Sequence, residues 1–153
     1  MNKFLTIIFG MILGFAAMQA QTPDAINWRI SVKMKSATEG VVNLRAVIAD
    51  GWHLYGTEMP EGGPKATSFS FTGSEGVKFI GAPKAAEKPI VKLDPMFEAK
   101  VPFWEGRVLF TQPFKVTDPA KAVIKGSVSF MGCNDETCLP PKTQTFTVKV
   151  PKK

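Results

Sequence analysis

The chain has 153 residues, 44% of them hydrophobic, and a formal net charge of +6. This length suits one domain with a core of adequate size. The positive residues are scattered singly along the chain, which is typical of a solvated surface and excludes the clustered basic patch of a nucleic-acid-binding protein. We therefore expect no nucleic-acid partner.

Residues 1–20 are typical of a secretory signal peptide. Lys3 provides the positive end, Phe4 to Ala17 form an apolar run, and Ala20 precedes a polar segment. The run is short for a membrane span, which takes about 20 residues. We expect cleavage after Ala20 and a periplasmic domain at residues 21–153, with an uncleaved anchor as the alternative. No later segment is long and apolar enough to cross a membrane.

Residues 28–35 alternate apolar and polar side chains without a break, the pattern of a strand with one buried face. Six further strand-like runs follow, divided by turn residues, at residues 41–48, 67–71, 77–80, 107–116, 122–130 and 143–150. No segment sustains the period of a helix. Short strands at this spacing predict an all-β fold, an immunoglobulin-like antiparallel β-sandwich.

The segment at residues 84–102 does not fit the strand pattern, because prolines interrupt it, Pro89 and Pro95 among them. Proline cannot donate a ladder hydrogen bond, so we expect much of the segment to be loop, and loops longer than about 12 residues are often functional. Met96 and Phe97 are apolar residues in this polar surrounding. They either cover a functional feature or are tucked into the edge of the core.

The only two cysteines, Cys133 and Cys138, are separated by four residues. If the flanking segments form a β-hairpin, facing residues lie about 4.5 to 5.5 Å apart between Cα atoms, which a disulfide can bridge. Such a bond is a poor staple, since closing so short a loop stabilises the fold by roughly 2 kcal/mol in the chain-entropy model. The spacing favours a dithiol that opens and closes, with a structural disulfide as the alternative.

The surroundings of the cysteines indicate which way electrons would move. Exported thiols meet oxidising conditions, so a working dithiol needs a source of electrons. Asp135 and Glu136 lie between the cysteines, and their negative charge disfavours a thiolate. This argues against a strongly oxidising disulfide donor and favours a pair that passes electrons to a docked partner.

Metal binding is the other common use of cysteines. A closed zinc site needs about four ligands, whereas the chain offers two cysteines and the single His53. A blue-copper site needs two histidines with a cysteine and fails on the same ground. Cuprous copper held by Cys133, Cys138 and Met131 stays open as an alternative. We expect exchange chemistry without a bound cofactor or metal.

The sequence Gly-Cys at residues 132–133, followed by Cys-Leu-Pro-Pro at residues 138–141, resembles the amino-terminal periplasmic domain of the DsbD family of thiol:disulfide interchange proteins. The segment Asp-Gly-Trp-His-Leu-Tyr at residues 50–55 is similar to an aromatic segment of that family. Phe97 falls where the family places the phenylalanine of its cap loop. The resemblance covers most of the chain, from residue 30 to residue 150.

The resemblance implies an immunoglobulin-like domain that receives electrons from a thioredoxin-like protein and passes them to periplasmic disulfide-bearing partners. It also implies that Cys138 forms mixed disulfides with partners and that Cys133 resolves them. Phe97 would shield the pair in the cap, beside Met96, and Tyr55 and His53 would line the site.

Two features depart from the family's pattern. The best-known members have five residues between the cysteines where this chain has four, and Pro95 and Met96 replace an acidic pair of the cap loop. With the sequence ending at Lys153, we expect the electron donor to be a separate protein.

The sequence thus predicts an exported thiol:disulfide oxidoreductase, of the protein-disulfide reductase type, that relays electrons through Cys133 and Cys138. The alternative is a non-catalytic secreted immunoglobulin-like interaction module in which the hairpin disulfide is structural.

Overall fold

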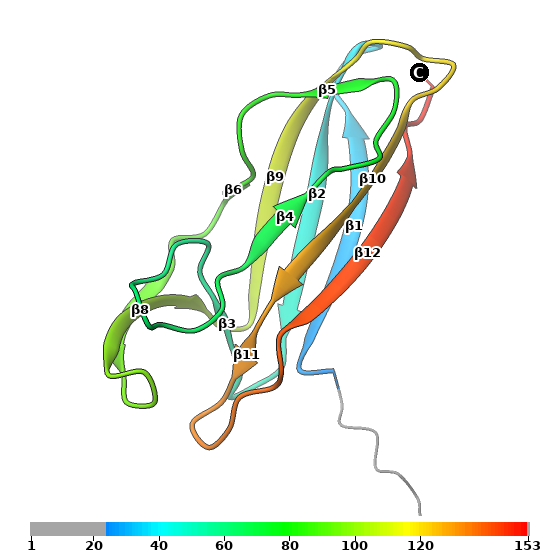
Figure 1. Ribbon diagram of the computed structural model, residues 1–153. Helices are drawn as coiled ribbons and strands as arrows, with labels where there is room; N and C mark the ends of the chain where they lie inside the picture. Colours follow the sequence, from blue (N-terminus) through cyan, green and yellow to red (C-terminus); the bar gives the residue numbers. More distant parts are fainter. Residues whose placement is uncertain (1–23, 153) are drawn as a thin grey trace, which may run out of the picture.

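The computed structural model describes residues 24–152 (Figure 1). The predicted signal peptide and its cleavage site lie outside the described residues. The described part forms twelve strands and no helix, in the order β1 (Ile26–Met34), β2 (Glu39–Ile48), β3 (His53–Tyr55), β4 (Ser68–Ser70), β5 (Val77–Phe79), β6 (Lys84–Ala85), β7 (Ile90–Asp94), β8 (Ala99–Trp104), β9 (Arg107–Val116), β10 (Val123–Phe130), β11 (Gly132–Cys133) and β12 (Lys142–Lys149). Nothing between residues 24 and 152 therefore provides a helix for crossing a membrane.

The strands form three antiparallel sheets. The largest has the order β1-β2-β9-β5, with β6 also paired to β9, the second has the order β12-β10-β4, and the third has the order β11-β3-β8-β7. The first two sheets face each other along the length of the molecule, and the third forms one end of it (Figure 1). This arrangement confirms the predicted antiparallel β-sandwich.

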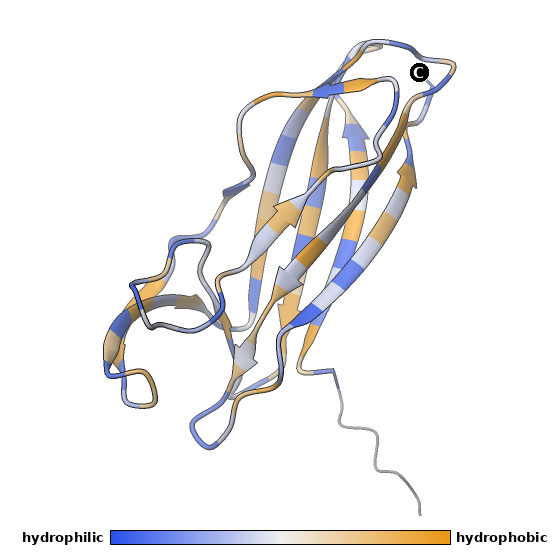
Figure 2. Cartoon of the chain, viewed as in Figure 1, coloured by the Kyte–Doolittle hydropathy of each residue, from blue (hydrophilic) through white to orange (hydrophobic). Residues whose placement is uncertain are grey.

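The alternation of side chains along the strands builds the main core. Apolar and polar residues alternate along β1, β2 and β9 (Figure 2), and the inward positions of β2 and β9 are fully or almost fully buried. Trp28 on β1 lies at the centre, and the distances from its ring centroid to those of Phe69, Phe110 and Phe130 are 5.7 to 6.0 Å. These aromatic contacts join both layers of the sandwich, and large buried rings dominate the stabilisation of such cores.

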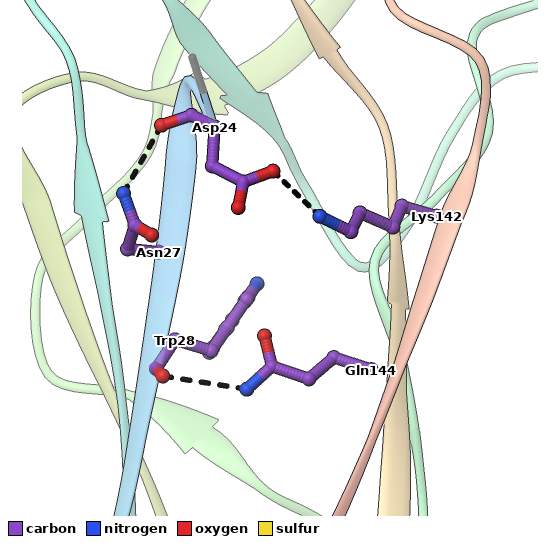
Figure 3. A network of polar contacts seen from close by, with 5 residues as sticks. All are labelled: Asp24, Asn27, Trp28, Lys142 and Gln144. Atoms are coloured by element: carbon purple, nitrogen blue, oxygen red, sulfur yellow. Dashed lines mark hydrogen bonds and ion pairs between the residues drawn. The ribbon is translucent and has the colours of Figure 1, made fainter. Parts of the chain in front are cut away.

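Polar contacts join β1 to β12 across one edge of the sandwich (Figure 3). Lys142 Nζ lies 2.6 Å from a carboxylate oxygen of Asp24, and the side-chain amide of Gln144 donates to the carbonyl of Trp28 at 3.4 Å. The amide of Asn27 donates to the carbonyl of Asp24 at 3.0 Å. Because Lys142 begins β12, these contacts anchor the chain just after the second cysteine.

The proline-interrupted segment at residues 84–102 is mostly strand, so the expectation of a loop there was wrong. Pro89 lies just before β7, and Pro95 lies in the turn between β7 and β8, where neither interrupts a ladder. Pro102 lies inside β8, and its carbonyl accepts a hydrogen bond from the backbone N–H of Gly56 at 2.8 Å. In an antiparallel ladder the nitrogen and the carbonyl of one residue face the same neighbouring strand. The nitrogen of Pro102, which has no hydrogen to donate, therefore faces Gly56, just beyond the end of β3.

Candidate redox site

The cysteine loop, residues 131–140, joins β10 to β12 and contains β11. Cys133 and Cys138 face each other across its neck and form a disulfide, with Cα atoms 4.0 Å apart, closer than the 4.5 Å or more expected of a hairpin neck. Asn134 Oδ1 accepts hydrogen bonds from the backbone N–H groups of Glu136 at 2.9 Å and Thr137 at 2.8 Å. The turn is therefore held by hydrogen bonds that do not involve the sulfur atoms.

The two sulfurs differ in access. Cys133 is only 1% exposed, and its backbone lies opposite that of His53 in the pairing of β11 with β3. Cys138 is partly exposed. Gly132 permits close packing behind the pair, because a Cβ atom there would lie 2.6 Å from Cδ1 of Ile26. The pair therefore has one buried and one partly exposed member.

The disulfide lies in a small apolar group of its own, which we call the site cluster. Its buried members are Tyr55, Val101, Phe103 and Cys133, and its partly buried members are Met59, Phe97, Ala99, Met131 and Cys138. The cluster is separate from the main core of the sandwich. The disulfide therefore lies outside the packing that holds the two large sheets together.

The cap hairpin consists of β7, β8 and the turn between them, residues 95–98, and it lies at the same end of the molecule as the cysteine loop (Figure 1). Asp94 ties it to the floor of the site. One carboxylate oxygen of Asp94 accepts from the backbone N–H of Met96 at 2.9 Å, and the other accepts from the hydroxyl of Tyr55 at 2.8 Å. Glu98 closes the turn with a positive φ of 52°.

Met96 and Phe97 at the tip of the cap hairpin point to different places. The Sδ atom of Met96 lies 3.2 Å from the Sγ atom of Cys138, and Met96 is 48% exposed. Phe97 packs inward against the site cluster, where its ring meets that of Tyr55 edge-on, with centroids 6.0 Å apart and an interplanar angle of 88°. The sulfur of Met96 thus contacts Cys138, and Phe97 packs the turn against the site cluster.

Tyr55 remains a neutral phenol over the physiological pH range. Burial raises the pKa of Tyr55 well above its ordinary value, and the hydrogen bond to Asp94 and the negative charge of Asp94 raise this pKa further. The protonated hydroxyl is therefore the donor that the Asp94 carboxylate needs to hold the cap hairpin in place.

His53 on β3 is the backbone register partner of Cys133 on β11. Its ring centroid is 4.5 Å from that of Phe103, and its Nε2 lies 3.0 Å from a carboxylate oxygen of Glu105. His53 also lines a groove of about 450 Å³ between the cap hairpin and the cysteine loop, together with Met96 and Asn134. The six residues expected at the site thus lie at one end of the molecule, while their roles remain predictions.

The family model described as "Thiol:disulfide interchange protein DsbD, N-terminal" matches residues 17–150. The chain belongs to the DsbD amino-terminal domain family. This family is one of thiol:disulfide interchange proteins, and the disulfide between Cys133 and Cys138 is the feature of this chain that fits such chemistry. A comparison with curated protein sequences gave no match.

Solved structures of related domains share the fold. The DsbD N-terminal domain of Neisseria meningitidis in the reduced form has a TM-score of 0.57 at 21% identity, covering 82% of this chain and 86% of that one. The N-terminal periplasmic domain of ScsB from Proteus mirabilis has a TM-score of 0.61 at 17% identity, covering 84% of this chain and 49% of that one. A complex between the DsbD and PilB N-terminal domains of Neisseria meningitidis has a TM-score of 0.56 at 18% identity, covering 88% and 91%. The immunoglobulin-like fold predicted from the strand pattern is therefore confirmed.

Three polar residues of this DsbD-family site were missed from the sequence. Asp94 precedes a proline and Asn134 follows a cysteine, and both residue types commonly fix turns through their side chains. That turn signal was present in the sequence. The contact of Asp94 with Tyr55, 39 residues away in the chain, and that of Glu105 with His53 have no sequence signal, because they arise only when β3 and the cap hairpin pack together.

Within residues 24–152, no three side chains of His, Cys, Asp or Glu converge in a group that could hold a metal ion. What the site offers chemically is a disulfide in an apolar setting, a neighbouring hairpin whose turn is held by the Asp94 carboxylate, and an adjoining groove.

Proposed function

We propose that this domain relays electrons in the periplasm by thiol:disulfide exchange at Cys133 and Cys138. The observation that carries the proposal is the disulfide itself, which joins one buried and one partly exposed cysteine and lies outside the main core, in a chain of the DsbD amino-terminal family. A periplasmic location is consistent with the related ScsB domain, which is a periplasmic one.

The relay conserves atoms and electrons in two exchanges. A thiolate of a reduced thioredoxin-like donor attacks Cys138, the bond to Cys133 breaks, and Cys133 leaves as a thiolate that takes up a proton. The donor's second thiol then attacks the mixed disulfide and releases Cys138. The donor becomes a disulfide and the domain a dithiol, with two electrons and two protons transferred. The reverse sequence, begun by Cys138, reduces a periplasmic disulfide-bearing acceptor.

The difference in exposure supports these roles for the two cysteines. Attack on a disulfide requires a thiolate to reach the sulfur atom, and reactivity therefore follows access. Cys138 is partly exposed and Cys133 is almost fully buried. Cys138 is thus the sulfur that forms mixed disulfides, and Cys133 is the one that resolves them.

The apolar edge of the cap hairpin supports a docking role for the thioredoxin-like donor. Val91, Leu93 and Met96 are 59%, 65% and 48% exposed, and large exposed apolar side chains gathered in this way commonly mark protein contacts. The Sδ atom of Met96 lies 3.2 Å from the Sγ atom of Cys138, so a donor sulfur that approaches Cys138 from that side must move Met96. The domain's relative in Neisseria meningitidis forms a complex with a PilB N-terminal domain, which supports the presence of a protein partner.

Trapping of a mixed disulfide tests the relay. In the Cys133→Ser variant, Cys138 has no resolving thiol and should form a lasting mixed disulfide with an oxidised periplasmic thioredoxin-like protein. The Cys138→Ser variant is the matched control, and its buried Cys133 should trap little or none. Trapping through Cys133 alone would reverse the roles, and no trapping by either variant would favour a non-catalytic module with a structural disulfide.

A further inference from the structure

The redox site contains methionine sulfur atoms in addition to those of its two cysteines. The described residues contain four methionines, and three of them, Met59, Met96 and Met131, lie in or against the site cluster. The fourth, Met34, lies on β1. Thiolate and thioether sulfur are the soft ligands that select cuprous copper, so this grouping of side chains has a specific chemical meaning.

We propose that the reduced domain binds one cuprous ion through Cys133, Cys138 and Met96. The proposal rests on the proposed function, which supplies the reduced dithiol. Sulfurs that share one metal ion at bonds of about 2.3 Å lie within about 4.6 Å of one another. The Sδ atom of Met96 is already 3.2 Å from the Sγ atom of Cys138, and the two cysteines face each other across a hairpin neck, so all three sulfurs are within reach of one ion.

Binding of the cuprous ion requires no transfer of electrons. The two thiols lose two protons, one cuprous ion takes their place, and the neutral thioether of Met96 completes the set. Asp135 and Glu136 are exposed on the turn between the cysteines, and their negative potential attracts a cation to the mouth of the site. The oxidised domain offers no thiolate, so binding depends on the redox state. An ion held here also occupies Cys138, the sulfur that would meet a partner.

Competition for cuprous copper tests the proposal. The domain is reduced, freed of reductant without oxygen, shown by thiol titration to have both thiols, and then titrated with cuprous copper against the chelator bathocuproine disulfonate. We expect one bound ion for the reduced protein and none for the oxidised protein. Removal of a ligand should weaken binding by about ten-fold or more, since even loss of a group that only orients a ligand costs that much affinity. Met96→Leu should show this loss, and Met34→Leu should bind as the unchanged protein does.

X-ray absorption at the copper edge adds a readout that a structural effect would not change. The unchanged domain should show three sulfur ligands, and Met96→Leu should show two. Absence of binding by the fully reduced protein would overturn the proposal. Weaker copper binding by Met131→Leu together with unchanged binding by Met96→Leu would also overturn it, because the thioether ligand would then be Met131. Thiol exchange with a thioredoxin-like protein, measured without metal, separates the two claims: exchange without copper binding rejects only the copper site, whereas copper binding without exchange supports the site and rejects the relay.

Discussion

Tyr55 is the residue through which the cap hairpin is tied to the floor of the site, and it is the only tyrosine of the chain. Burial and Asp94 raise the pKa of Tyr55 above the ordinary value of about 10. Because the folded state binds this proton more tightly, its contribution to the free energy of unfolding is full below about pH 10 and is lost as the pH rises through the folded pKa.

Alkaline titration should therefore separate the native from the unfolded tyrosine. We expect the absorbance of tyrosinate to appear at a distinctly higher pH in the native protein than in urea, and the stability of the unchanged protein to fall above about pH 10. The free energy of unfolding of Tyr55→Phe should fall less over the same pH range, because this variant has no tyrosine to ionise. A native tyrosine that ionises at its ordinary pH would show that the contact with Asp94 does not hold in solution.

Phe97 is the residue we expect to keep the cap hairpin closed. Burying a phenylalanine side chain is favourable by about 1.5 to 3 kcal/mol, enough to favour the closed turn yet small enough for a docking partner to offset. Phe97→Ala should leave the fold intact and speed the reaction of the reduced thiols with a small disulfide oxidant several-fold. Leu93→Ala, an exposed position on the same hairpin, should change that rate little. Unchanged reactivity in folded Phe97→Ala would return Phe97 to the role of a residue at the edge of the core.

At the scale of elements, the strands of the two large sheets, apart from the short β6, could be predicted because alternation is a local signal. Each of the seven strand-like runs corresponds to an observed strand, as residues 28–35 do to β1 and residues 107–116 to β9. The cap hairpin could not be predicted, because its prolines lie where no ladder donor is lost, and that placement depends on which neighbour each strand has. Its two contacts with the site, from Asp94 to Tyr55 and from Met96 to Cys138, join residues 39 and 42 positions apart.

The cysteine loop should keep its shape without its disulfide. Asn134 holds the turn through two backbone hydrogen bonds, and a loop so short gains roughly 2 kcal/mol or less from the bond in the chain-entropy model. Replacing Cys133 and Cys138 together by alanine should therefore lower the free energy of unfolding by no more than about 2 kcal/mol and abolish electron transfer. Urea unfolding of the double variant measures this, and a variant that fails to fold would show that the bond is structural.

At the scale of the whole molecule, stability and chemistry are assigned to different parts. The main core, centred on Trp28, joins the two large sheets. Most residues of the site cluster belong to the cap hairpin and the cysteine loop, and these two segments lie at one end of the molecule (Figure 1). The family resemblance could be read from the cysteine motif and the aromatic segment at residues 50–55, because those residues are close in sequence. Met131 is close to the cysteines in the sequence and could be grouped with them, whereas Met59 and Met96 join the site only in the fold.

The reduction potential of the pair Cys133 and Cys138, measured by equilibration of the folded domain with glutathione or dithiothreitol buffers, tests the central claim most directly. Structural disulfides generally have potentials below about −300 mV, and exchanging ones have higher potentials. We predict a value above about −300 mV, with the domain remaining folded in both redox states. A potential below that limit, or unfolding on reduction, would contradict the relay and identify the bond as a structural one.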